Sequence, residues 1–369
     1  MRSSALVIGG TGPTGPGIVS GLEQRGYDVT ILHTGAHELD EVAHLPHLHG
    51  DVRSSEGLTT ALAGSRHDSF DVVVATYGRL RAIAEILVDR CGHLLSVGGM
   101  PAYQGYFNAD DFTPSGLPVP TGEDGPTATE AQDGKSYRIR RTEEIVFEHH
   151  ASATHFRYPI VYGPRQLIPR EWLVVRRIID RRPFIILPDG GLTLNMMGFT
   201  ENLAHAVLLA VDRPDAAAGQ VFNCGDEEVL TLRQMVELIA AELDHDWEVI
   251  SMPYELAPCT KPLVAQHRTT HKVLDIGHLR HRLGYADVVP AREAVRQTAR
   301  WLLEHRPDPG GMEEMVLEDP FDYGAEDALV SGWRSAIAAL PAVEWSSPPG
   351  YGLGYGGPGA TRVRPDTRI

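Results

Sequence analysis

A tyrosine and an arginine stand four residues apart in the stretch KSYRIRRTEE, residues 135–144, directly before an apolar run. In a helix this spacing places Tyr137 and Arg141 on one face. The pKa of a free tyrosine is about 10, so a tyrosine that exchanges protons near neutral pH needs a nearby cation. One interpretation of this stretch is therefore a catalytic acid/base pair on a helix. The alternative is a solvated helix surface, on which Arg140 or Arg141 pairs with Glu144.

A glycine-rich turn near the N-terminus predicts a second chemical role, the binding of a dinucleotide. The run VIGGTGPTGPG joins a strand-like stretch to a helix-like one. Glycines at this spacing permit a tight turn, close approach of a pyrophosphate and close packing of helix on strand. The phosphates would then accept hydrogen bonds from free N–H groups at the helix N-terminus. We expect the cofactor to contact Gly9, Thr11, Gly12, Pro13, Thr14 and Gly15.

The end of the next predicted strand bears on the choice of cofactor. This strand ends with His33 and Thr34, where an NAD site usually has an acidic residue for the ribose hydroxyls. An acid there would repel a 2′-phosphate, and none is present at these two positions. We therefore predict NADP, with NAD as the alternative. Asp51 and Val52 follow the third strand and are predicted to contact the adenine, unless Asp51 is a plain turn residue.

Apolar runs alternate with helix-like stretches along the first half of the chain. This pattern predicts an α/β fold with a doubly wound parallel sheet, and the chain length fits one large α/β unit with an attached lobe. In such sheets ligands bind at the carboxyl ends of the strands. The residues at or after the ends of later strands complete the expected cofactor site: Ala75, Tyr158, Pro159 and Val161.

The expected domain boundaries follow the same pattern. We expect residues 1–165 to form the dinucleotide-binding domain, which also receives about 195–225. The substrate lobe would comprise 166–194 and 226–340, and a Gly/Pro-rich tail would follow at 341–369. A long Pro/Gly/Asp-rich segment at 104–135 is expected to be a functional loop.

Taken in order, these motifs resemble the extended short-chain dehydrogenase/reductase family, which includes NAD-dependent epimerases and dehydratases. The resemblance runs from the glycine turn to about residue 305, and its motifs are GGTGPTG, GDV, SVGG…Y, YRIRR, RYPIVYGPR, FTENLAHAV, VFNCGD and LRHRLGY. It implies a Rossmann-type domain, a smaller C-terminal α+β substrate lobe and a nicotinamide cofactor. It also implies that Tyr137 is the tyrosine of the family's Y-x-x-x-K motif, that Arg141 is its electrostatic partner, and that both residues contact the cofactor.

The chain departs from the family pattern at the catalytic residues. Arg141 stands at the lysine position, and its planar, bulkier side chain aims its donors differently. Lys135 could substitute only if the preceding loop folds back. Ser96 is expected either to donate a hydrogen bond to the substrate or only to cap its strand. Glycine replaces the family's second hydroxyl, closer to the following tyrosine.

The expected substrate-lining residues are Tyr103, Asn195 and Met197. Asn195 stands where the family's sugar-nucleotide enzymes carry an arginine for the diphosphate, while Met197 could form an adaptable apolar wall. Four arginines could bind an anionic substrate, although their helical spacing places most of them on the surface: Arg165, Arg170, Arg176 and Arg177. We therefore predict an NADP-dependent oxidoreductase for a small, partly apolar carbonyl or alcohol. A sugar-nucleotide epimerase or dehydratase with tightly bound NAD, and a dinucleotide-binding sensor without redox chemistry, are the alternatives.

The composition of the chain excludes some classes of binding partner. The chain of 369 residues has 33 Lys+Arg against 49 Asp+Glu, a net charge of −16, which argues against nucleic-acid and membrane partners. Its three cysteines lack metal or redox spacing and indicate a cytoplasmic protein with reduced thiols. His44, His47 and His49 have no cysteine or carboxylate beside them, so no metal site is expected. The family resemblance implies a possible homodimer.

Overall fold

The structure is a computed structural model that describes residues 2–36, 38–76 and 78–346. Contacts within the chain divide it into two units, Met1–Pro320 and Phe321–Ile369. The described part of the second unit contains helix α13 (Tyr323–Ala338), capped by the carboxylate of Asp322. Residues 347–369 of the predicted tail lie outside the described residues. Among the described helices, none combines the length and apolar character needed to cross a bilayer.

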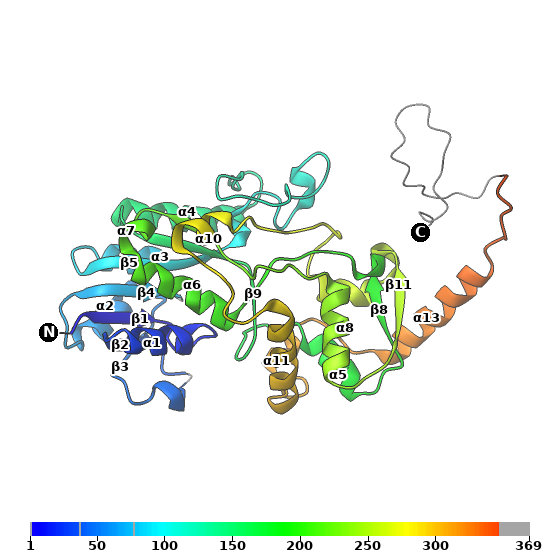
Figure 1. The fold of residues 1–369 in the computed structure, drawn as a ribbon, viewed down its shortest axis with the longest axis horizontal. Helices are drawn as coiled ribbons and strands as arrows, with labels where there is room; N and C mark the ends of the chain where they lie inside the picture. The colour runs from blue at the N-terminus through cyan, green and yellow to red at the C-terminus, as the bar shows by residue number, and fades with distance from the viewer. Residues whose placement is uncertain (1, 37, 77, 347–369) are drawn as a thin grey trace. The chain divides into compact units, whose positions relative to one another are not determined.

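Seven parallel strands form the central sheet of the first unit, in the order β10-β6-β5-β4-β1-β2-β3 (Figure 1). The strands are β1 (Ser4–Ile8), β2 (Asp28–His33), β3 (His47–His49), β4 (Phe70–Ala75), β5 (Cys91–Gly99), β6 (Thr154–Tyr158) and β10 (Val221–Asn223). Successive side chains of a strand point to opposite faces. In β1, Ala5 and Val7 accordingly join one apolar layer, while Leu6 and Ile8 join the other.

Helices cover both faces of this sheet. Helices α1 (Gly15–Gln24) and α6 (Thr200–Asp212) pack against the Ala5 layer through residues such as Val19 and Val207. The opposite layer is covered by α2 (Ser55–Ala63), α3 (Leu80–Ile86) and α4 (Gly134–His149). The predicted Rossmann-type doubly wound sheet is therefore confirmed.

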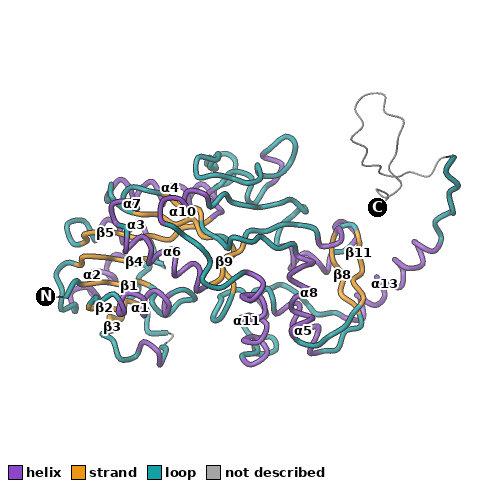
Figure 2. The backbone as a smooth tube through the Cα atoms, in the orientation of Figure 1, coloured by secondary structure: helices purple, strands orange, loops and turns teal. Residues whose placement is uncertain are grey.

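A smaller group of elements extends from the carboxyl ends of the strands (Figure 2). Two further parallel pairs join β7 (Ile160–Tyr162) to β9 (Met197–Phe199), and β8 (Phe184–Pro188) to β11 (Glu248–Met252). The longer helices here are α5 (Trp172–Ile179), α8 (Leu232–Glu242) and α11 (Ala291–Glu304). The short helices α9 (Lys261–Val264) and α12 (Met312–Met315) follow in this part of the chain, whereas the short helices α7 (Pro214–Ala217) and α10 (Gly277–Leu283) lie beside the central sheet. After entering this lobe the chain returns to the sheet with α6 and β10.

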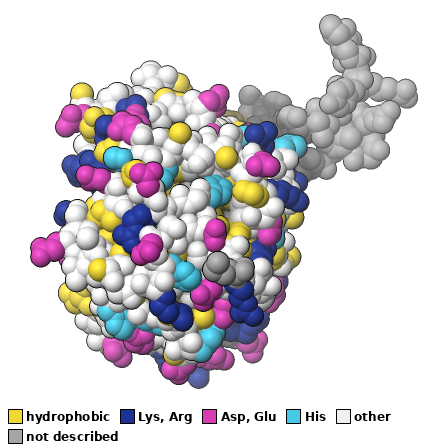
Figure 3. Space-filling view, turned by 90° about the vertical axis from the view of Figure 1, so that its left-hand side faces the viewer, with side chains coloured by type: hydrophobic (Ala, Val, Ile, Leu, Met, Phe, Trp, Pro, Cys, Tyr) yellow, Lys and Arg dark blue, Asp and Glu magenta, His cyan; other side chains and the backbone are white. Residues whose placement is uncertain are grey.

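Acidic and basic side chains are interspersed over the face shown in Figure 3. Exposed ion pairs occur in the described chain, for example Arg25 with Asp212 at 2.6 Å. Such pairs each contribute little to stability.

One buried ion pair ties α4 to the sheet. The guanidinium of Arg157, on β6, donates to both carboxylate oxygens of Glu143, at 2.9 and 2.8 Å. It also donates to the hydroxyl of Tyr103 at 2.7 Å, and all three side chains are buried. Burial alone would raise the pKa of Glu143, but the hydrogen bonds and charge of Arg157 hold it below its usual value.

Removing this arginine leaves a buried carboxylate unpaired. We expect Arg157→Met to lower the free energy of unfolding by about 3–5 kcal/mol, measured by urea unfolding followed by circular dichroism. Because folding lowers the pKa of Glu143, the pair stabilises the protein above the unfolded pKa of about 4.3, and this stabilisation is lost as the pH falls through the folded value. The deficit of the variant should therefore shrink in acid.

The matched control is Arg141→Met, which removes an arginine from the surface pairs of the same helix. It should leave the urea midpoint nearly unchanged. Equal losses in the two variants would contradict the role given to Arg157.

Candidate cofactor and substrate cleft

The glycine turn between β1 and α1 forms a bare backbone surface. Gly9 has φ of 92°, a left-handed conformation that favours glycine. The N–H of Gly12 donates to the carbonyl of Gly9 at 2.9 Å, which closes the turn. A β-carbon on Gly15 would lie 2.3 Å from the carbonyl oxygen of Gly10, so only glycine fits there. The turn thus leaves room at the helix N-terminus that fits a dinucleotide pyrophosphate.

A cleft of about 600 Å³ opens over this turn. Its volume is in the usual range for small-molecule sites. Most of the predicted cofactor residues line it: Gly9, Thr11, Gly12, Pro13, Thr14, His33, Thr34, Tyr158, Pro159 and Val161. The structure therefore brings together, in one cleft, residues that the sequence predicted at the ends of several different strands.

Besides Tyr137 and Arg141, four predicted cofactor residues do not line the cleft: Gly15, Asp51, Val52 and Ala75. Gly15 packs helix on turn, and Val52 and Ala75 are buried in the core because their side chains point into the layer under α2 and α3. The Asp51 carboxylate accepts from the N–H of Arg53 at 2.9 Å, as the turn interpretation proposed. Their neighbours Arg53 and Thr76 line the cleft instead.

Tyr137 and Arg141, the predicted catalytic pair, are not among the residues that line the cleft. Helix α4 buries Ser136, Glu143 and Val146, and Tyr137 is rotated by about 100° from Ser136. Arg141 donates to Glu148 at 2.7 Å and to Glu144 at 3.1 Å. Arg140 also pairs with Glu144. The alternative of a solvated helix surface is therefore the one that the structure supports.

Ser96 and Tyr103 do not line the cleft either, and the side chains of both are fully buried. The hydroxyl of Ser96 lies 2.8 Å from Nδ1 of His155. Burial lowers the pKa of His155 to about 4, so this imidazole is neutral. The hydroxyl of Tyr103 donates to the side-chain oxygen of Asn223 at 2.7 Å. At the end of β5, Gly98 and Gly99 line the cleft, so no side-chain hydroxyl faces it there.

Three polar residues gather at the end of the cleft nearest the lobe. Tyr106 and Arg170 line it, and the ammonium of Lys272 lies 4.2 Å from the centroid of the Tyr106 ring. Lys272 is buried, and this burial, with the charge of Arg170, lowers its pKa to about 8. Among the described residues, neither cation forms an ion pair. This end of the cleft is therefore electropositive and suits an anionic group.

Sequence reasoning missed Tyr106 and Lys272. Tyr106 lies in the 104–135 segment that was expected to be functional, but nothing there distinguished it from other aromatic residues. Lys272 carries no motif, and it meets Tyr106 only through the tertiary fold.

A smaller cavity of about 50 Å³ adjoins the cleft and shares Ile160 and Arg170 with it. The predicted substrate residues Asn195 and Met197 line this cavity. Glu171 also lines it, and burial raises the pKa of its carboxyl group. One oxygen of Glu171 accepts from Gln166 at 2.8 Å, and the other has no hydrogen-bond partner within the described chain.

No protein-family model matches the chain. Among curated proteins, it is 29% identical over 166 residues to "Uncharacterized protein YbjS" of Escherichia coli K12, covering 39% of this chain and 48% of that protein. It is 30% identical over 82 residues to UDP-D-apiose/UDP-D-xylose synthase 2 of Arabidopsis thaliana, covering 22% of this chain and 21% of the synthase. The chain thus spans about half, or less, of the curated relatives it matches.

Solved structures match over more of the chain. UDP-glucose 4-epimerase of Thermotoga maritima, with UDP-glucose, has a TM-score of 0.64 at 17% identity and covers 82% of this chain and 100% of its own. The dTDP-glucose 4,6-dehydratase DesIV of Streptomyces venezuelae, with NAD and TYD bound, has a TM-score of 0.61 at 20% identity, covering 82% and 98%. The chain has the fold of the extended short-chain dehydrogenases/reductases, so the resemblance seen in the sequence is confirmed at the level of the fold.

A bulky side chain on the glycine turn should exclude a dinucleotide. A β-carbon at Gly12 would already lie 3.2 Å from the carbonyl of Gly9, and the rest of a valine side chain would enter the cleft. We expect Gly12→Val to weaken NADH and NADPH binding at least about tenfold in fluorescence titrations. Tyr137→Phe should bind as wild type does. A comparable loss in Tyr137→Phe would restore that residue to the site.

Proposed function

We propose that the protein is an NAD(P)-dependent oxidoreductase of the extended short-chain type, and that its substrate is a small, partly apolar carbonyl or alcohol with an anionic group. The observation that carries the proposal is that Tyr106 and Arg170 line the same cleft as the glycine turn. Solved structures of this fold carry bound NAD, which supports a nicotinamide cofactor. Leu167 and Ile168 supply apolar walls.

When bound, the nicotinamide cofactor supplies hydride transfer. Tyr106 is the candidate proton donor: burial raises the pKa of its phenol, the charge of Arg170 opposes this only in part, and the hydroxyl stays protonated at neutral pH. It can therefore donate to a carbonyl oxygen that gains negative charge. Arg170 would hold the anionic group of the substrate, and Lys272 would keep the pocket positive below a pH of about 8.

For the cofactor, we propose NADP as the preferred form. His33 and Thr34 line the cleft where an NAD site usually has an acid, and Arg53 lines the same region. A guanidinium suits the 2′-phosphate. We expect Arg53→Met to weaken NADPH binding about tenfold while NADH binding changes little, as measured by calorimetry. Tighter NADH than NADPH binding in the wild type would overturn this preference.

Removing the Tyr106 hydroxyl should separate chemistry from binding. We expect Tyr106→Phe to lower turnover by about 10²-fold or more, while NADPH affinity is unchanged. The assay follows NADPH absorbance with a panel of carbonyl compounds that carry carboxylate or phosphate groups. Tyr137→Phe is the matched control and should keep its rate. A Tyr106→Phe enzyme as fast as wild type would refute the proposed donor.

The positive charge of Lys272 should appear in the pH profile. Its lowered pKa of about 8 means that the ammonium is present below this pH and lost above it. We expect KM for an anionic substrate to rise as the pH increases through about 8. In Lys272→Met this rise should be absent and KM high throughout. The same rise in both proteins would exclude Lys272 as its source.

A second candidate is a dinucleotide-binding sensor without redox chemistry. It is favoured by Gly98 and Gly99 at the end of β5 and by the surface position of Arg141. It predicts NADPH binding by calorimetry without turnover of any panel compound. Release of NAD on denaturation, again without net turnover, would instead indicate a cofactor-recycling epimerase or dehydratase.

A further inference from the structure

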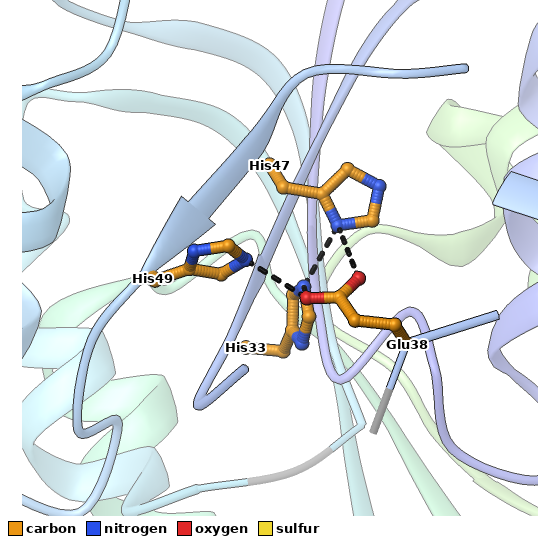
Figure 4. Close-up of side chains that lie close together, drawn as sticks. All are labelled: His33, Glu38, His47 and His49. Atoms are coloured by element: carbon orange, nitrogen blue, oxygen red, sulfur yellow. Dashed lines mark hydrogen bonds and ion pairs between the residues drawn. The ribbon is translucent and has the colours of Figure 1, made fainter. Parts of the chain in front are cut away.

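Three histidines and a glutamate converge at the edge of the central sheet (Figure 4). His33 ends β2, and His47 and His49 begin and end the edge strand β3. His33 is paired in register with His49, and His47 lies two residues earlier on the same face. The connection between the strands adds Glu38.

The ligand-type atoms of these side chains lie close enough to share one ion. Nε2 of His33 is 2.7 Å from Nδ1 of His47, Nε2 of His49 is 3.1 Å from the Glu38 carboxylate, and His47 is 3.5 Å from the same carboxylate. All four atoms lie within 4.8 Å of one another. A tetrahedral zinc site with ligands at about 2.0–2.1 Å has ligand–ligand separations of about 3.3 Å, inside this range.

We propose that His33, Glu38, His47 and His49 bind one divalent transition-metal ion of the zinc class. Imidazole nitrogens with a carboxylate oxygen are a ligand set that such ions accept in four-coordinate sites. The side chains of His33 and His47 are only 5% and 11% exposed, whereas those of His49 and Glu38 are about half exposed, at 55% and 53%. The site therefore has a rigid inner half and an outer half open to solvent.

The hydrogen bonds around the rings fit this role. Nε2 of His47 lies 2.9 Å from the carbonyl of Val42, so it carries the proton and leaves Nδ1 free as a ligand. Nδ1 of His33 accepts from the N–H of Gly35 at 3.2 Å, so its proton is on Nε2 and points to His47. Metal binding moves that proton to Nδ1 and ends the contact with Gly35, which lies in an exposed loop.

This arrangement reverses the expectation of no metal site. The sequence run HLPHLHG has no acidic residue, but the fold brings Glu38 to it. His44, the first histidine of the run, does not join the cluster and lies 2.9 Å from Glu23. Because His33 also lines the cofactor cleft, the ion would fix β3 to β2 at the cleft's rim.

The test uses the full chain without a histidine tag, freed of metal by a chelator and dialysed. Zinc is titrated in competition with a chromophoric chelator, and Co²⁺ is added separately to detect the visible absorption of a tetrahedral site. We expect one ion per chain, bound with Kd below about 1 µM. The double variant His47→Ala/His49→Ala should bind zinc about 10²-fold more weakly or worse, and zinc should raise the melting temperature of the wild type but not that of the double variant.

His44→Ala is the matched control, since it removes a histidine of the same run from outside the cluster, and it should bind zinc as the wild type does. Circular dichroism of the metal-free proteins verifies that each variant is folded. Glu38→Gln, which keeps the shape of the side chain, gives an independent measure if the double variant fails to fold, and should weaken binding about tenfold. Wild-type zinc binding that is only millimolar, or equal in wild type and Glu38→Gln, would overturn the proposal.

Discussion

The buried ion pair between Glu143 and Arg157 determines how helix α4 lies on the sheet. A guanidinium without its partner is strongly disfavoured in the interior, so the helix cannot roll to expose Glu143 and leave Arg157 buried alone. This fixes Ser136 and Val146 against the protein and leaves Arg141 among surface glutamates. The same guanidinium holds the hydroxyl of Tyr103. One contact between helix and strand thus decides which side chains of this region can reach the cleft and which cannot.

Tyr106 and Lys272, on which the proposed function depends, lie in segments outside the regular sheet. Tyr106 belongs to the connection between β5 and α4, and Lys272 to the segment before α10. These segments lie alongside each other because the N–H of Thr121 donates to the carbonyl of Val273 at 2.8 Å, and Asp275 donates back to Thr121 at 2.8 Å. Lys272 is in turn bonded through its backbone to Leu194 at 2.8 Å. Backbone pairing between distant loops, rather than a helical spacing, brings a phenol and an ammonium together.

The sequence predicted the features that depend on neighbouring residues. It did not predict those that depend on contacts between residues far apart in the chain. Gly12 and Tyr158 could be assigned because each is marked by its own strand and turn, and parallel strands end at one edge. The spacing of Tyr137 and Arg141 predicts a shared face but not where that face points. Its direction depends on Glu143 meeting a residue on another element. Glu38 and Lys272 carry no local signal, since their partners are distant in sequence or separated from them by a loop.

The packing at the end of β5 restricts which residue can stand at position 98, where glycine supplies no side-chain hydroxyl. A β-carbon on Gly98 would lie 2.4 Å from Nε2 of His155, a buried ring that is held by Ser96 at 2.8 Å and lies 3.5 Å from Glu143. A serine at this position would therefore have to arise together with a smaller residue at position 155. A single Gly98→Ser substitution would force a buried, hydrogen-bonded ring to move, so this position can gain a hydroxyl only through a coupled change at two sites.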